Sequence, residues 1–579
     1  MPAKTRHTGA MHVVTNTIRR GDREYRSVLL RRSYRQDGKV KKETLANLSH
    51  LPAEAIDAIR RVLAGEALVG AGDAFEIERS LPAGHVNAAL LMARRLGLWS
   101  LLDSRPSRQR DLCMAMIVSR VIGPGSKLST VRRLGQSTLA SELGVEGVDE
   151  DDLYAAMDWL AGRQARVEDE LAKRHLREGE MVLYDVSSSY FEGRACPLAR
   201  LGYSRDGQKN LPQIIYGLLC DSEGRPVACE VFSGELHDDK TLPAQVTKIK
   251  HRFGLAAVTV IADRGMVTKA NIETFAASEG ISWITALKAP TIKKLVRDGI
   301  FQPSLFDDQN LGELTNVEEF PGERLIVCRN PLVGVQRARK RQELLDATET
   351  ELEQIKARVD KGTLLGSAQI GLAVGPALKR FHVKKHFEVQ ITDTDFTYQR
   401  KQQQIDQEAA LDGFYILRTS LPASDLPTGD VVRAYKNLEQ VERAFGSIKG
   451  PDLQIRPIHH HLEHRVRCHV LICMLAYYLT WHLKAAWKPL LFTDENRPTS
   501  NDPVAKATRS HTAQRKAKTK RTSTGGPAHS YQTLLTELAT QTRNTTRLTG
   551  QTRTFEKLTQ PTPLQAQALT LAAQAPIVT

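Results

Sequence analysis

The order of strand-like and helix-like runs in the middle of this sequence constrains its fold more than any other feature. Three β-rich runs come first: MVLYDVS (181–187), PQIIYGLLCD (212–221) and PVACEVFSG (226–234). A helical run, a buried strand (256–263), a second helical run and another strand (281–287) follow. Strands that alternate with helices in this way predict an α/β fold.

This element order is that of ribonuclease H-like folds, although other α/β folds share parts of it. Residues 291–410 interrupt the order with a charged helix at heptad spacing and further strand-like sequence. The α/β pattern then resumes with a strand (413–420) and two helices (431–449 and 460–484). We therefore predict an α/β ribonuclease H-like core that a large insertion interrupts.

The flanking sequence has different periodicities. Residues 12–48 alternate as strands around the turn-forming RGDRE, and residues 81–176 carry apolar residues at helical spacing. The predicted parts are a small N-terminal β/α unit (1–75), an all-α bundle (76–176), the first half of the core (177–290), the insertion (291–410), the second half of the core (411–490) and a basic C-terminal tail (491–579).

Positive charge is concentrated in that tail. Residues 504–579 contain 11 Lys and Arg against two Asp and Glu, and so supply +9 of the net charge of +15. Such a segment is typical of an arm that binds polyanions, and equally of a solubilising, partly disordered tail.

Composition also bears on location. The seven cysteines are scattered, the N-terminus lacks an apolar signal segment, and the longest apolar run (466–481) is interrupted by polar residues and is short for a bilayer. We expect a cytoplasmic protein without a membrane partner.

Three acidic residues are candidates for chemistry. Asp185 and Asp263 each end a predicted strand, where either one alone could cap a turn, but the two together would crowd negative charge into one cleft. Glu442 lies on an apolar stripe of a predicted helix and has no cation at i±4. Three carboxylates that need a partner predict a site for Mg²⁺ or Mn²⁺.

The acidic motifs resemble those of a known family. The string Tyr435-x2-Leu438-x3-Glu442-x6-Lys449 resembles the Tyr-x2-Arg-x3-Glu-x6-Lys signature of bacterial insertion-sequence DDE transposases. LYDVSSSYFEG and IADRGM resemble the two aspartate motifs, and longer phrases such as GYSRDGQKNLPQIIYGL and VERAFGSIK resemble the branch with an extended N-terminus. Leu438 is a departure, because the signature has Arg there. The DNA contact of that Arg is then missing or supplied by another arginine: Arg433, Arg443 or Arg456.

The resemblance implies an enzyme that binds terminal inverted repeats, hydrolyses phosphodiester bonds in line and joins the 3′-OH ends to target DNA. Asp185 would bridge two Mg²⁺ ions, for which Mn²⁺ can substitute, while Asp263 and Glu442 would each hold one. DNA contacts are expected from six residues: Tyr435, Lys449, Arg264, Arg205, Lys209 and Arg456. Two DNA ends must be cut in concert, which implies a homodimer that uses residues 76–176 for DNA binding or dimerisation.

Two other motifs are weaker. His460, His464 and Cys468 repeat every four residues, but no Cys-x2-Cys pair accompanies them, so we expect the histidines to line the DNA side of the core rather than bind zinc. GPGSKLS (123–129) superficially resembles a phosphate loop, but it lacks that motif's spacing and a preceding strand. We expect no nucleotide cofactor.

Two alternatives to a transposase remain open. One is a resolvase or repair nuclease with the same metal site, and the other is a non-catalytic DNA-binding relative. A glycosidase is disfavoured, because five Trp in 579 residues provide few platforms for stacking sugars.

Overall fold

A computed structural model describes residues 10–36, 38–66, 74–276, 278–306, 308–549 and 551–575. The chain divides into two compact units, one of residues 1–80 with 543–559 and one of residues 81–542 with 560–579.

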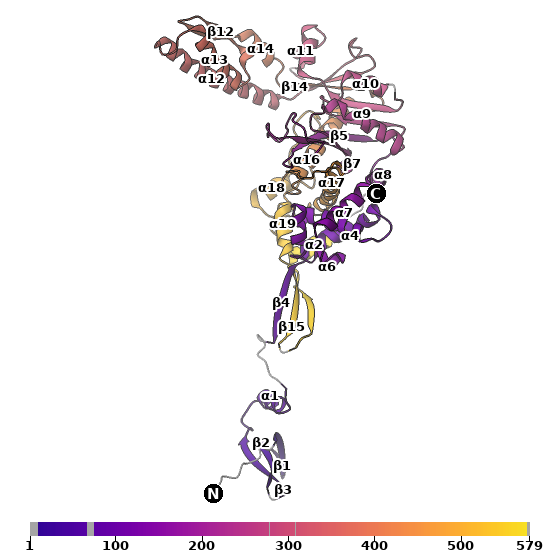
Figure 1. Cartoon of the computed structure of the whole chain (residues 1–579), viewed down its shortest axis with the longest axis vertical. Coiled ribbons are helices and arrows are strands. Elements are labelled where there is room, and N and C mark those ends of the chain that lie inside the picture. The colour runs from indigo at the N-terminus through magenta and orange to yellow at the C-terminus, as the bar shows by residue number, and fades with distance from the viewer. Residues whose placement is uncertain are drawn as a thin grey trace. The chain divides into compact units, whose positions relative to one another are not determined.

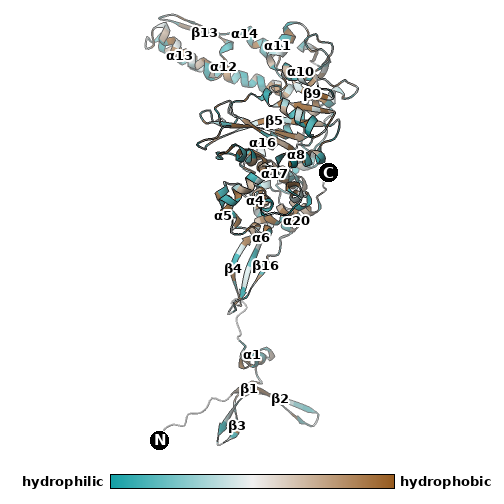
Figure 2. Ribbon diagram, turned by 45° about the vertical axis from the view of Figure 1, so that its right-hand side comes forward, coloured by the Kyte–Doolittle hydropathy of each residue, from teal (hydrophilic) through white to brown (hydrophobic). Residues whose placement is uncertain are grey.

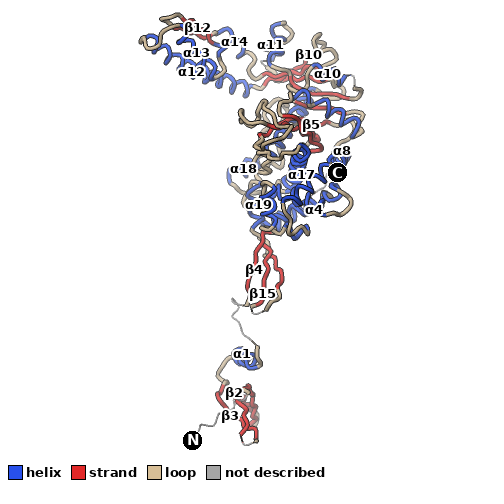
Figure 3. The backbone as a smooth tube through the Cα atoms, viewed as in Figure 1, coloured by secondary structure: helices blue, strands red, loops and turns tan. Residues whose placement is uncertain are grey.

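The smaller unit is built from antiparallel strands. The predicted β unit at its start is confirmed as a three-stranded meander, and its second sheet has the order β16-β15-β4, which joins strands from both ends of the sequence (Figure 3). The elements are β1 (Met11–Arg20), β2 (Arg23–Gln36), β3 (Lys39–Asn47), α1 (Ala53–Leu63), β4 (Phe75–Pro82), β15 (Thr542–Leu548) and β16 (Thr554–Leu558).

The larger unit begins with the predicted helical bundle. Local sequence sets where its helices start: Ser107 accepts a hydrogen bond from the Arg110 N–H, and Asp149 forms a capping box with Asp152. The helices are α2 (Gly84–Arg95), α3 (Leu98–Leu102), α4 (Arg108–Ile122), α5 (Lys127–Leu134), α6 (Leu139–Leu143), α7 (Glu150–Ala161) and α8 (Gln164–His175).

Helix α17 (Glu463–Ala486) joins this bundle to the sheet, because it packs on α4 and α7 as well as on β7. Among the described residues, α17 alone is long and apolar enough to cross a bilayer, and 89% of its apolar window is buried inside the protein. The run that looked too short in the sequence therefore belongs to a longer helix, and its apolar side chains fill the core.

An eight-stranded mixed sheet lies at the centre of the larger unit, in the order β10-β11-β14-β9-β8-β5-β6-β7 (Figure 1). Strands β5, β8 and β9 run parallel, whereas β5, β6 and β7 are antiparallel neighbours. Figure 2 shows the apolar colouring of the strands around β5 and β9. The strands are β5 (Met181–Tyr190), β6 (Gln213–Asp221), β7 (Pro226–Ser233), β8 (Val258–Ala262), β9 (Ile281–Ala286), β10 (Leu311–Leu314), β11 (Arg324–Arg329) and β14 (Phe414–Thr419).

Short helices cover the connections of the sheet. They are η1 (Asp238–Lys240), α9 (Leu242–Thr247), the π-helical turn η2 (Lys248–Arg252), α10 (Lys269–Ala276), α11 (Ala289–Arg297), η3 (Pro303–Phe306), α15 (Thr428–Lys436) and α16 (Leu438–Lys449).

The insertion is smaller than the range 291–410 predicted from sequence. Strands β10 and β11 fall within that range but extend the central sheet, where β11 pairs with β14. The part with its own apolar core starts at α12 (Pro331–Asp360), whose heptad residues Leu345, Leu352 and Val359 are buried. It also contains α13 (Ser367–Arg380), η4 (Lys384–His386), β12 (Phe387–Ile391), β13 (Phe396–Arg400) and α14 (Gln402–Ala409).

The C-terminal segment differs from the tail predicted for residues 491–579. It forms α18 (His511–Thr519), α19 (Tyr531–Ala539) and α20 (Pro563–Gln574), and α19 and α20 pack against α2. The Trp487 Nε1–H donates to the Ala568 carbonyl over 2.9 Å, and the basic residue Lys516 is 2% exposed beside Glu495. Periodic apolar residues among the Thr, Gln and Lys of this segment bury it against the bundle.

Candidate active site

Strand register brings two of the predicted carboxylates together. The parallel pair β5 and β8 ends with Tyr184 opposite Ala262, so Asp185 and Asp263 are the next residues on each chain. Asp263 follows the end of β8, as predicted, but Asp185 lies in the middle of β5, which continues along β6 to Tyr190. Parallel pairing stops beside Asp185, and this leaves room for ligands at the carboxyl end of β8.

Glu442 reaches the same place from a helix. The predicted helix 431–449 is interrupted at Asn437, so Tyr435 lies on α15 while Glu442 and Lys449 lie on α16. Helix α16 packs on β5, and its Phe445 ring meets the Tyr216 ring at 5.8 Å. Glu442 lies beside the apolar stripe of α16, but its side chain is exposed, because it faces a cleft next to the packed residues.

The cleft has a volume of ≈ 340 Å³ and is lined by six charged side chains: Asp185, Asp263, Glu442, Asp238, Arg205 and Lys449. Five of these are predicted site residues. The sixth, Asp238, precedes a helical segment and could cap it by its position in the sequence, but the structure pairs it with Arg205 at the cleft. The two acids of GELHDDKTL were the signal that could have pointed to it.

Negative charge accumulates in this cleft. The pKa of Asp185 is raised to about 7, first by burial and also by the carboxylates of Asp263 and Glu442, while the Val186 N–H and Arg205 oppose the rise. Neither Asp263 nor Glu442 has a side-chain hydrogen bond or ion pair with a described residue. Carboxylates that repel one another without neutralising partners have the donor chemistry of a site for hard divalent cations.

The three carboxylates line the cleft, but they are too far apart to coordinate one metal ion together. Within the described ranges, no three His, Cys, Asp or Glu side chains converge closely enough to hold one ion. The donor types therefore fit a divalent cation, and side-chain rotation would have to complete its coordination. The same finding applies to the histidines and Cys468 that were weighed as zinc ligands.

Lys449 and Arg456, both predicted to contact DNA, converge on a carboxylate that sequence reasoning missed. The Lys449 Nζ donates to Asp206 over 2.8 Å, and the Arg456 guanidinium pairs with the same oxygen. The Asp206 side chain is 1% exposed and also accepts the Tyr190 N–H over 3.2 Å. Burial lowers the pKa of Lys449, and the contact with Asp206 opposes that change. No local pattern marks Asp206, because its two cationic partners are more than 240 residues away.

Replacing Asp206 by Asn is expected to destabilise the protein by about 3 kcal/mol, because two cations would lose their buried counter-charge. Urea unfolding at neutral pH measures this effect. Asp151→Asn, at an exposed position of α7, is the matched control and should change the free energy of unfolding by less than about 0.5 kcal/mol. Equal stabilities of the two variants would contradict the bridging role of Asp206.

The three remaining residues that were predicted to contact DNA differ in their exposure and in their distance from the cleft. Arg264 is exposed next to Asp263, and Tyr435 is half-buried, with a pKa that burial raises and the charge of Asp263 raises further. Lys209 is exposed but does not line the cleft.

Leu438, at the Arg position of the signature, is 7% exposed in the core and cannot contact DNA. Each arginine weighed as its replacement has an acidic partner: Arg433 pairs with Asp430, Arg443 with Glu439 and Arg456 with Asp206.

Two family models match parts of this chain. Residues 199–479 match the model of the transposase DDE domain, and residues 13–72 match that of the N-terminal domain of IS1634 family transposases. No curated protein matches the chain. Among solved structures it is similar to a piggyBac transposase in a synaptic complex with hairpin DNA, at 9% identity and a TM-score of 0.35, over 79% of this chain and 76% of that one. The matches to these two transposase domains identify the chain as an insertion-sequence DDE transposase.

Proposed function

We propose that this transposase binds the terminal inverted repeats of its element, cleaves DNA at the cleft of Asp185, Asp263 and Glu442, and joins the freed 3′-OH ends to target DNA. The observation that carries the proposal is that these three carboxylates, from β5, the end of β8 and α16, line one cleft. The core would be ribonuclease H-like. The strand order β7-β6-β5-β8-β9, with the first three strands antiparallel and the last three parallel, supports that assignment.

In the proposed mechanism the three carboxylates hold Mg²⁺, for which Mn²⁺ can substitute. The bound ions would supply Lewis acidity at the scissile phosphate and lower the pKa of the attacking water. Arg205 and Lys449 supply positive charge at the same cleft, where the DNA backbone would lie. Their pairing with Asp238 and Asp206 orients both cations before DNA arrives.

The active assembly would be a homodimer, because one three-carboxylate site acts on one DNA end at a time. Tyr435 and Arg264 would contact the strand next to the cleft, and Lys209 would contact it further away. The enzyme would act on DNA in the bacterial cytosol.

A joining assay tests the proposal. DNA from either side of the gene supplies the candidate inverted repeats, and a pre-cleaved end is prepared with either a 3′-OH or a 3′-deoxy terminus. We expect Mg²⁺-dependent products joined to target DNA from the 3′-OH end alone. Cleavage without any joined product would instead assign the site to a hydrolytic nuclease.

A further inference from the structure

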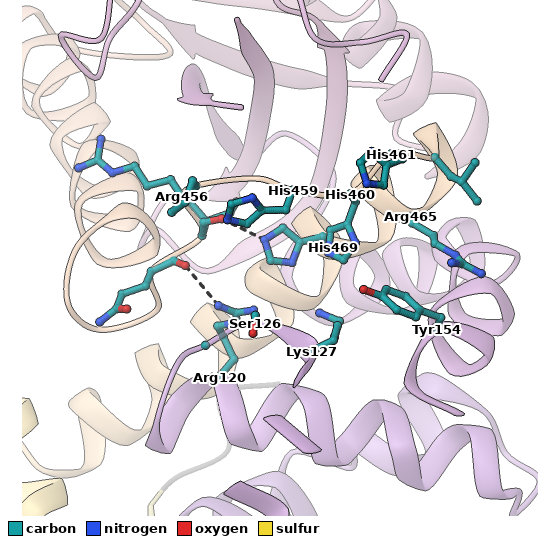
Figure 4. A pocket seen from close by; sticks show the side chains of 15 residues that line it. Arg120, Ser126, Lys127, Tyr154, Arg456, His459, His460, His461, Arg465 and His469 are labelled. Carbon is teal, nitrogen blue, oxygen red and sulfur yellow. Dashed lines mark hydrogen bonds between the residues drawn. The ribbon is translucent and has the colours of Figure 1, made fainter. Parts of the chain in front are cut away.

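A second, larger pocket lies apart from the carboxylate cleft and shares no lining residue with it. Its volume is ≈ 670 Å³, and it opens between the α4–α5 region of the helical bundle and the segment from Gln454 to His469 (Figure 4). Both sides belong to the larger unit.

The lining of this pocket carries positive charge and no carboxylate. Four cationic side chains line it, Arg120, Lys127, Arg456 and Arg465, together with four histidines. Arg465 is held from outside the lining by Asp158, through two contacts of 2.8–2.9 Å, and Arg456 is held by Asp206. Arg120 is buried and donates to the carbonyls of Leu453 and Gln454.

Lys127 is the cation without a partner. It is 5% exposed, and no hydrogen bond or ion pair joins it to any described residue. Burial and the charge of Arg120 lower the pKa of Lys127 to about 8. Three buried cysteines, Cys113, Cys468 and Cys473, oppose this change, but burial raises the pKa of their thiols and so favours the neutral form. Figure 4 shows the Lys127 side chain directed into the pocket toward His460 and His469. A buried ammonium group without a counter-charge is costly unless a ligand supplies one.

The backbone at the start of α5 adds to the positive electrostatic potential of the pocket. Gly125, Ser126 and Lys127 line the pocket at the start of α5, where Ser126 caps the helix by accepting the Ser129 N–H. The first N–H groups of a helix have no partners within it, and the helix dipole is positive at this end. The GPGSKLS segment therefore places the start of a helix beside the buried ammonium group of Lys127. Its spacing still excludes a nucleotide phosphate loop.

We propose that this pocket binds a phosphate group, through Lys127 and the start of α5, as an anion site separate from the carboxylate cleft. The DNA backbone is the expected source of that phosphate, and in this respect the inference rests on the proposed function. Arg456 lines the pocket and pairs with Asp206, which also holds Lys449 at the cleft. One chain of ion pairs therefore connects the two sites, so a strand held in the pocket would lie close to the strand being cut.

The test uses the full-length protein in EDTA, so that cleavage plays no part. The variants are Lys127→Gln, Lys127→Arg and, as the matched control, Arg132→Gln, which removes one charge from the same helix at an exposed position. Affinity for a DNA duplex is measured by fluorescence anisotropy over a range of salt concentrations. Stabilisation by inorganic phosphate, relative to chloride at equal ionic strength, is measured by thermal unfolding.

For Lys127→Gln we expect DNA affinity to fall about tenfold or more, the salt slope to decrease by about 0.9, and stabilisation by phosphate to disappear. Lys127→Arg should retain both kinds of binding, and Arg132→Gln should change affinity less than twofold. Loss of phosphate stabilisation with unchanged DNA affinity would overturn DNA as the source and leave a site for free phosphate. If Lys127→Gln matches the wild type in both measurements, the phosphate site is wrong.

The Lys127 measurements and the joining assay test separate claims, so either claim can be contradicted while the other stands. A protein that shows the Lys127 effect but joins no DNA ends would retain the pocket and lose the transposition mechanism. If the Lys127→Gln variant joins DNA ends normally, the transposition mechanism stands and the proposed phosphate site is contradicted.

Discussion

Asp185→Asn, Asp263→Asn and Glu442→Gln should each reduce DNA cleavage on the order of 10³-fold or more, because each removes one of the few oxygen ligands that a catalytic cation could use. Binding of the element's ends should remain nearly normal, since none of the three side chains is a cation that contacts phosphate. Asp185→Asn also removes the carboxylate whose pKa is raised by burial and by the charges of Asp263 and Glu442. The measurement pairs Mg²⁺-dependent cleavage of labelled end DNA with a binding assay in EDTA.

The matched control for this series is Glu439→Gln on the same helix as Glu442. Glu439 is exposed and pairs with Arg443 four residues later, so its loss should leave cleavage within about twofold of the wild type. Near-normal cleavage by any one of the three carboxylate variants would remove that residue from the proposed site. A matching loss of end binding would point to misfolding or to a direct contact with DNA.

The second large effect is expected from deletion of residues 504–579, which should abolish cooperative folding of the larger unit. The deletion removes α19 and α20, whose buried residues include Leu534, Leu538 and Ala568, and it uncovers the face of α2 that they cover. Each large apolar side chain removed from a core costs about 2–5 kcal/mol, and the total exceeds the stability of most domains. Circular dichroism during heating should show a broad, non-cooperative transition, and the truncated protein should aggregate.

A charge-neutralised variant separates packing from charge. Replacing the exposed residues Arg515, Lys518, Lys520 and Arg521 by Gln keeps every buried side chain of the segment. This variant should unfold like the wild type but bind DNA with a salt slope smaller by about 0.9 for each DNA phosphate that the segment no longer neutralises. Cooperative, wild-type-like melting of the truncated protein would show instead that the segment is dispensable for folding.

Strands and helices were predictable wherever apolar periodicity was strong. The runs at β5, β6 and β8 show this, and so does the bundle from α2 to α8. Asp185 and Asp263 could be associated from sequence because both adjoin buried strands. Their side-by-side placement depends on the parallel register, which no local pattern encodes.

The errors arose where tertiary contacts decide. Asp206 pairs with Lys449 across most of the core, and β10 and β11 join the sheet although they lie within sequence that resembles an insertion. Glu442 looked buried because helical periodicity cannot separate the edge of a packed face from its centre. The sequences of α19 and α20 are rich in threonine and glutamine and look like a polar tail. The few apolar residues among them are nevertheless enough to pack both helices against the bundle.

The packing of α20 against α2 has a consequence for how the gene can decay. Helix α2 leaves the ribosome early, but its partner is encoded almost five hundred codons later. The bundle therefore stays open throughout translation and closes only when the last helix emerges. A nonsense or frameshift mutation anywhere before the codons for α20 should thus silence the element as completely as one near the codons for α2.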